Sequence, residues 1–136
     1  ARKSEPDELV KFAETLNHLM PERHKAFLGS LLDFIEFDGY YFVHAGVRPG
    51  IALARQKASD LLWIRDIFIN HDGMFEKVIV HGHTPREQPE NLPNRINIDT
   101  GAYATHKLTA VVLEGEKRTF LNGASEANYA EVSPIF

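Results

Sequence analysis

Three short apolar runs in this 136-residue chain end in the same way. Each run is followed directly by polar side chains and glycine: His44-Ala45-Gly46, His81-Gly82-His83-Thr84 and Asp99-Thr100-Gly101. Short runs rich in β-branched and aromatic residues are typical of buried strands. In open α/β sheets, ligand sites form where strand ends converge, because glycine lets the backbone approach closely there. The pattern therefore predicts an α/β fold with a polar site at one edge of a sheet.

The remaining sequence supplies the other elements of such a fold. Apolar residues at helical spacing predict an amphipathic helix capped by Ser4 and a shorter helix opened by Pro21, the second with a buried apolar stripe. Asp38-Gly39 and Gly115-Glu116 are expected to be tight turns between paired strands. The predicted elements are helices over 4–20, 21–32 and 51–70, and strands over 33–37, 40–43, 77–80, 95–98, 108–113 and 118–121. No linker divides the chain, so a single domain over residues 1–136 is expected, with weak periodicity from 122 onward.

Composition excludes several classes of function. The chain has 15 Lys and Arg against 19 Asp and Glu, and the basic residues are scattered, so nucleic acid is not an expected partner. No apolar run approaches the roughly 20 residues that span a bilayer, so no membrane partner is expected either. The chain has no Cys, which excludes disulfides, thiolate metal sites and a cysteine nucleophile. The absence of Cys favours the cytoplasm as its location.

Two of the seven histidines occur at positions that are not expected to face solvent. His44 and His83 each close an apolar strand and precede Ala-Gly or Thr-Pro. Neutral imidazole is a common ligand of zinc, manganese and iron, so a metal or catalytic role is predicted for both. His81 stands two residues from His83, a spacing that directs both side chains to one side of a strand unless Gly82 turns one away. The other four fit surface or turn positions: His18, His24, His71 and His106.

Four further residues are candidates near that edge. Arg65 follows an apolar cluster, where an arginine either packs its stem over the core or directs its head group at an anion. Arg48 stands in the loop after His44 and is a candidate for the same site. Asp99 and Tyr103 either orient ligands or satisfy backbone groups in a turn. Spacing alone leaves these alternatives open.

Four segments occur together in the order of a known family: Tyr41-Phe42-Val43-His44-Ala45-Gly46, Leu61-Leu62-Trp63-Ile64-Arg65, Val80-His81-Gly82-His83-Thr84-Pro85 and Asn97-Ile98-Asp99-Thr100-Gly101-Ala102-Tyr103. Together they resemble the C-terminal half of a bacterial phosphoprotein phosphatase, within the calcineurin-like metallophosphoesterases. The similarity runs across most of residues 20–121. The resemblance implies an α/β fold, a partial metallophosphoesterase β-sandwich flanked by helices that forms the C-terminal part of a four-layer αββα fold.

The resemblance also implies a site and a reaction. His44 and His83 would be ligands of one metal in a dinuclear centre of manganese, iron or zinc, with manganese expected first and His81 as a weaker candidate. Arg65 would hold the substrate phosphate, with Arg48 and Tyr103 beside the substrate. A water or hydroxide bridging two metals attacks phosphorus in that family. The implied activity is that of a serine/threonine phosphatase, and the implied partners are phosphorylated proteins or small phosphoesters.

Three segments of the family pattern do not occur in the sequence: Gly-Asp-x-His-Gly, Gly-Asp-x-x-Asp-Arg-Gly and Gly-Asn-His-Glu. They provide the remaining ligands, the bridging Asp and a proton donor, and are expected upstream of residue 1. Because a dinuclear centre needs about three or four protein ligands per ion, the 136 residues alone are expected to be inactive. Half of a sandwich also exposes apolar sheet surface, which favours self-association.

Three other functions fit parts of the sequence. A dinucleoside polyphosphate hydrolase of the same superfamily uses the same metal chemistry. A phosphate-binding or partner-binding module without catalysis would keep Arg65 and no metal. An aspartic protease would use Asp99-Thr100-Gly101 from two copies of the chain, whose Asp residues share a proton; the strongly helical segment over 5–32 argues against it.

Overall fold

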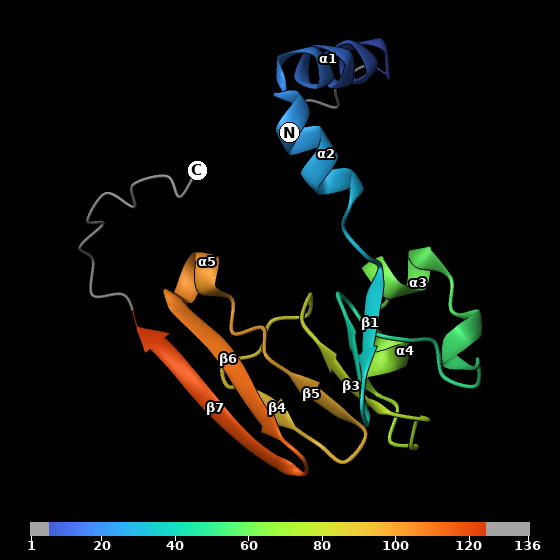
Figure 1. Cartoon of the computed structure of the whole chain (residues 1–136), viewed down its shortest axis with the longest axis vertical. Helices are drawn as coiled ribbons and strands as arrows, with labels where there is room; N and C mark the ends of the chain where they lie inside the picture. Colours follow the sequence, from blue (N-terminus) through green and yellow to red (C-terminus); the bar gives the residue numbers. More distant parts are fainter. Residues whose placement is uncertain (1–5, 125–136) are drawn as a thin grey trace. The chain divides into compact units, whose positions relative to one another are not determined.

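A computed structural model describes residues 6–124 of the chain (Figure 1). The chain divides into two compact units, Ala1–Leu32 and Asp33–Phe136. The single domain expected over residues 1–136 stays a prediction. Within the described residues, no helix is long and apolar enough to cross a membrane. Ser4, the expected cap of the first helix, and residues 125–136, part of the weakly periodic end of the sequence, lie outside the described part.

The first unit consists of two helices, α1 (Pro6–Leu19) and α2 (Glu22–Gly29). Acidic residues in the first turn of each helix complement the helix dipole, and Pro21 precedes α2 as expected. The large apolar residues of this unit are exposed, which corrects the expectation of a buried stripe on the second helix. Nine of them are about half exposed or more: Leu9, Val10, Phe12, Leu16, Leu19, Phe27, Leu28, Leu31 and Leu32.

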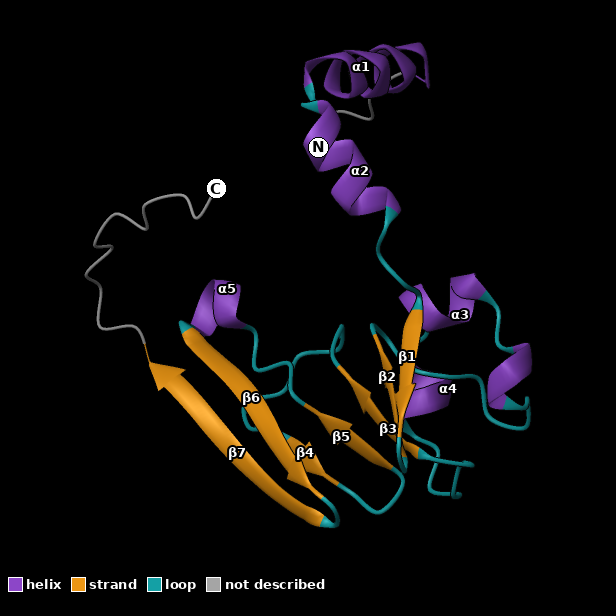
Figure 2. Cartoon of the chain, in the orientation of Figure 1, coloured by secondary structure: helices purple, strands orange, loops and turns teal. Residues whose placement is uncertain are grey.

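The second unit is built on a mixed five-stranded sheet in the order β1-β2-β3-β5-β4 (Figure 2). Its strands are β1 (Phe34–Phe37), β2 (Tyr40–Val43), β3 (Val78–His81), β4 (Glu90–Asn91) and β5 (Arg95–Asn97). The three central strands β2, β3 and β5 run parallel, whereas β1 and β4 pair antiparallel at the edges. The carboxyl ends of the three central strands therefore lie at one edge of the sheet, as the sequence predicted.

Neighbouring residues of a strand point to opposite faces of the sheet. Both faces of the central strands are buried, each by a different layer. One face, which includes Tyr41 and Ile79, packs with Leu61 and Phe68 from the helical segment. The other face, which includes Tyr40 and Val80, packs against the hairpin of β6 (Lys107–Glu114) and β7 (Lys117–Ala124). The unit thus has three layers: short helices, the five-stranded sheet and a two-stranded sheet. This arrangement confirms the α/β class with a sheet flanked by helices.

The predicted helix over 51–70 is broken into three pieces. They are η1 (Leu53–Arg55), α3 (Ala58–Trp63) and α4 (Asp66–Ile69), separated by extended backbone at Gln56 and Ile64. The side chain of Gln56 bonds to the backbone of Arg48 and Ile51, which closes a loop in place of a helical turn. The short helix α5 (Ala102–Thr105) was not predicted.

Candidate metal site

The pairing of β2 with β3 brings His44 next to the His81-Gly82-His83 segment. The two strands are parallel, and the register continues beyond them as the Gly82 amide donates to the His44 carbonyl oxygen over 2.9 Å. His83 then adopts a left-handed backbone with φ of 65°. A histidine in this conformation is uncommon and marks a position determined by its surroundings. The turn at His83 accompanies a direct contact of its ring with His44.

The two imidazoles face each other through single nitrogen atoms. His44 Nε2 lies 3.1 Å from His83 Nδ1, and the ring centroids are 4.8 Å apart. Two nitrogens about 2.1 Å from one ion and 3.1 Å apart would subtend an angle of about 95° at that ion. That angle suits two neighbouring ligands of one metal. Nδ1 of His83 and Nε2 of His44 are therefore the atoms that fit a cation.

The surroundings of His83 favour the neutral imidazole that metal binding requires. Burial lowers the pKa of His83, and the positive charges of Arg65 and His44 lower it further, while Asp99 raises it. Trp63 stands edge-on to the His83 ring with centroids 5.8 Å apart. The Nε2 atom of His83 is buried and has no hydrogen-bond partner within residues 6–124. The ring is thus held by packing, with Nδ1 directed at His44.

Arg65 lies between α3 and α4, and its head group points toward the same place. Its Nη1 donates to the carbonyl oxygen of His83 over 3.2 Å, and the side chain is otherwise exposed. Of the two alternatives left by the sequence, the structure shows the head group directed to the candidate site. Its role toward phosphate stays a prediction.

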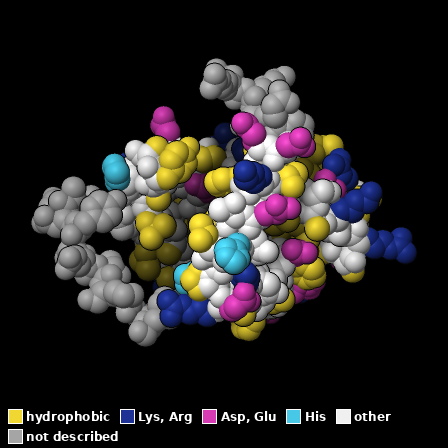
Figure 3. All heavy atoms as spheres, turned by 90° about the horizontal axis from the view of Figure 1, so that it is seen from above, with side chains coloured by type: hydrophobic (Ala, Val, Ile, Leu, Met, Phe, Trp, Pro, Cys, Tyr) yellow, Lys and Arg dark blue, Asp and Glu magenta, His cyan; other side chains and the backbone are white. Residues whose placement is uncertain are grey.

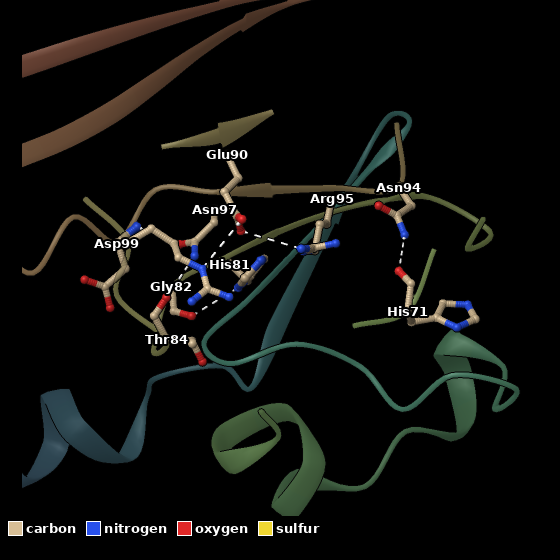
Figure 4. Close-up of polar contacts among 10 residues, drawn as sticks. His71, His81, Gly82, Thr84, Glu90, Asn94, Arg95, Asn97 and Asp99 are labelled. Atoms are coloured by element: carbon tan, nitrogen blue, oxygen red, sulfur yellow. Dashed lines mark hydrogen bonds and ion pairs between the residues drawn. The ribbon is translucent and has the colours of Figure 1, made fainter. Parts of the chain in front are cut away.

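His81 is turned away from the histidine pair. Its ring packs edge-on against Phe68, with centroids 4.8 Å apart, and its Nδ1 is 3.0 Å from the Gly82 carbonyl oxygen (Figure 4). Burial lowers the pKa of His81 to about 4, so the ring is neutral. His81 belongs to β3 and shares the face of Ile79, which packs with Phe68, whereas His83 lies beyond the strand with a left-handed backbone. The structure therefore places His81 in the core and does not join it to His44 and His83.

The remaining candidates lie apart from the histidine pair or support it indirectly. Arg48 forms a two-bond ion pair with Asp60. Tyr103 belongs to α5 and is 87% exposed. Asp99 accepts a hydrogen bond from the Gly101 amide, a turn contact. Its side chain lies so close to Gly82 that a Cβ there would stand 3.3 Å from the Asp99 Cβ.

Asn97 holds the candidate site in place, a role that sequence reasoning missed. It is fully buried on β5 beside His81. Its side-chain amide donates to the Thr84 carbonyl oxygen, and its side-chain oxygen accepts from the Asp99 amide, each over 2.9 Å. Figure 4 shows Asn97 close to Thr84 and Asp99. One feature of the sequence could have indicated this role: the amide side chain of Asn97 stands between Ile96 and Ile98 in a predicted strand.

We expect Asn97→Ala to lower the free energy of unfolding by about 2–3 kcal/mol, because it leaves buried backbone groups without partners. Urea unfolding followed by circular dichroism measures the change. Asn70→Ala is the matched control, since Asn70 is exposed at the end of α4. An equal loss in the two variants would contradict the role given to Asn97.

The described residues bring together two potential metal ligands. Among residues 6–124, no group of three or more His, Asp and Glu side chains is placed to hold a metal ion. Two facing imidazole nitrogens, one of them on a neutral ring, nevertheless fit two ligand positions of one divalent ion. The donor set is consistent with manganese, iron or zinc and does not distinguish them.

Comparison with known proteins finds a solved structure of similar fold. No protein-family model matches the sequence, and no curated protein matches it. A solved structure does: a crystal structure described as a "putative diadenosine tetraphosphatase" superposes with a TM-score of 0.63 at 20% sequence identity. The match covers 86% of this chain and 64% of that one, so the chain spans less than two-thirds of its neighbour's length. The likeness confirms the α/β fold expected from the sequence.

Proposed function

We propose that this chain is part of a metal-dependent phosphoester hydrolase, in which His44 and His83 are ligands of one divalent metal ion. The observation that carries the proposal is the 3.1 Å approach of His44 Nε2 to His83 Nδ1 at the carboxyl ends of two parallel strands. The family resemblance of the surrounding segments and the fold of the solved neighbour support it. Manganese is the ion proposed first.

In this mechanism the metal supplies an activated water and Lewis-acid stabilisation of phosphoryl oxygens. His44 and His83 bind through the nitrogens that face each other, and burial keeps the His83 ring neutral. Arg65 is exposed beside His83, so its planar head group can bind two phosphoryl oxygens and orient the phosphorus for attack. Two imidazoles do not complete a coordination sphere, so the proposal assigns the remaining ligands to residues outside 6–124.

Two substrate classes fit this site. The resemblance to phosphoprotein phosphatases favours phosphoserine and phosphothreonine esters. The name of the solved neighbour supports dinucleoside polyphosphates at least as well. Both reactions use water to displace an oxygen leaving group from phosphorus, so the same two histidines and Arg65 serve either one. Arg48 and Tyr103 carry less support, because one is paired with Asp60 and the other lies exposed on α5.

The proposal is tested by hydrolysis assays on the natural protein that carries this sequence. Diadenosine tetraphosphate and a phosphoserine peptide are compared with and without Mn²⁺. We expect hydrolysis of one substrate that is lost with EDTA and in His44→Ala. Activity that survives both changes would overturn the proposal. The ratio of kcat/KM for the two substrates decides between the substrate classes.

Arg65→Ala is expected to lower kcat/KM about ten- to hundredfold, the loss of a hydrogen bond to a charged group. Arg65→Lys should recover only part of the loss, since an ammonium keeps the charge and not the two-pronged geometry. Steady-state kinetics measure both, and Lys117→Ala, at an exposed position of the β6–β7 hairpin, controls for the loss of a positive charge. Unchanged kinetics in Arg65→Ala would contradict its assignment to phosphate.

A further inference from the structure

A cavity beside α3 has a lining that the proposed hydrolysis does not use. Its volume is about 470 Å³, within the range of small-molecule sites. It is lined by Arg48, Ile51, Arg55, Lys57, Ser59 and Asp60. Three of these residues are basic and one is acidic, whereas the whole chain has more acidic than basic residues. The cavity therefore concentrates positive charge in a chain with a net charge of -4.

Asp60 fixes the orientation of Arg48. The Nε and Nη2 atoms of Arg48 donate to the two carboxylate oxygens over 2.9 and 2.6 Å. The hydrogen bond from Arg48 lowers the pKa of Asp60, so the pair stays charged. A guanidinium group has five N–H donors, and this pairing uses two of them. Because the Arg48 side chain is 44% exposed, its other donors are open to a ligand.

The loop that forms the wall is also held in one conformation. The Gln56 side chain accepts from the Arg48 amide over 2.8 Å and donates to the carbonyl oxygens of Arg48 and Ile51. Leu53 anchors the loop in the core, and its amide donates to Glu76 over 3.0 Å. Because this loop is already ordered before a ligand binds, binding costs less conformational entropy.

Arg55 and Lys57 bring further positive charge to the cavity, and the charge of Lys57 also helps to lower the pKa of Asp60. Both are exposed, and within residues 6–124 neither side chain forms an ion pair or a hydrogen bond. Ile51, which is 44% exposed, forms an apolar part of the same wall. Figure 3 shows how charged and hydrophobic side chains lie side by side on one face of the molecule. Free cations attract anions, and an apolar wall favours an organic group attached to the anion.

We propose that this cavity binds a phosphorylated small molecule. Its phosphoryl oxygens would bind Arg48, Arg55 and Lys57, and its organic part would lie against Ile51. Arginine suits this ligand because its planar donors match the geometry of phosphate oxygens. None of His44, His83 and Arg65 lines the cavity, although Arg48, a weaker candidate for the substrate of the proposed hydrolase, does; the cavity needs no metal. The two proposals can therefore fail separately.

Isothermal titration in the presence of EDTA tests the site, with inorganic tripolyphosphate and ATP as probes. Arg55→Ala/Lys57→Ala is expected to weaken tripolyphosphate binding at least about tenfold, the loss of hydrogen bonds to a charged ligand. The matched control is Lys107→Ala/Lys117→Ala, which removes the same charge from exposed positions on the hairpin and should change affinity less than about twofold. An equal loss in the two double variants, or no saturable binding by the parent chain, would overturn the proposal.

Three further variants locate the ligand. Arg65→Ala and His83→Ala should keep full affinity in EDTA; a loss confined to them would place the ligand at the metal site and overturn the proposal. ATP should bind more tightly than tripolyphosphate, and Ile51→Ser should remove the difference. Equal affinity of the two probes for the parent chain would overturn the role given to Ile51.

Discussion

Replacing His83 by alanine is expected to lower the affinity for Mn²⁺ at least about a hundredfold, more than changes to residues that only support metal ligands. The substitution removes one of the two nitrogens that face each other across 3.1 Å. His44→Ala should have a similar effect. The double variant should bind little more weakly than either single one, because both residues act on the same ion.

The chain offers a built-in reporter for this measurement. Trp63 is its single tryptophan, and its ring lies 5.8 Å from that of His83. Paramagnetic Mn²⁺ bound at His83 should quench Trp63 fluorescence in a saturable way. The 136 residues alone are expected to bind weakly and to release the ion on desalting, since two imidazoles are an incomplete ligand set.

His106→Ala is the matched control, because His106 is exposed at the end of α5. It should leave the quenching curve unchanged. Quenching that is the same in His83→Ala, His44→Ala and the parent chain would place the ion elsewhere and remove the central support for the proposed hydrolase. Two ions retained per chain after desalting would contradict the expectation that other residues complete the site.

Gly46→Ala should produce the largest loss of stability, about 4 kcal/mol of unfolding free energy. Gly46 has φ of 144°, a backbone that costs other residues about 1–3 kcal/mol. A Cβ at this position would stand 2.3 Å from Cδ1 of Phe68. Phe68 is fully buried between Phe75 and His81, so relieving the overlap costs about 1–3 kcal/mol more. Urea unfolding measures the change.

Gly50→Ala separates the two causes. Gly50 also has a positive φ, 77°, but nothing lies within 4 Å of a Cβ placed there. Its loss should be only about 1–2 kcal/mol, the backbone cost of a left-handed residue. Phe68→Ala should then offset part of the effect of Gly46→Ala in the double variant. Equal losses for the two glycines, or strict additivity with Phe68→Ala, would contradict the steric explanation.

Much of the second unit could be predicted from local sequence. Asp38-Gly39 and Gly115-Glu116 form turns with left-handed backbone at Asp38 and Gly115, as these residue types favour. The strands over 40–43 and 78–81 follow from runs of aromatic and β-branched residues. Residues 51–70 are mostly helical, as predicted, but the breaks between the helical pieces were not predicted, because the loop-closing bonds of the Gln56 side chain are not visible in an apolar pattern.

The first unit shows what a local sequence pattern does not predict. The helical pattern predicted α1 and α2 correctly, since the spacing of apolar residues is local. The buried stripe predicted for the second helix is exposed in the structure. Periodicity states which face of a helix is apolar; whether that face is covered depends on other elements.

The sequence by itself determined the α/β class, the turns and the choice of His44, His83 and Arg65 as candidates. The tertiary structure alone decided which of the candidates meet. The parallel register of β2 and β3 and the left-handed backbone of His83 bring its Nδ1 to His44, whereas the alternation of side chains along β3 places His81 against Phe68. Arg48, in the loop that follows His44, instead forms an ion pair with Asp60. Local preferences determine elements, whereas the contacts of a site join residues distant in the chain and depend on the pairing of whole strands.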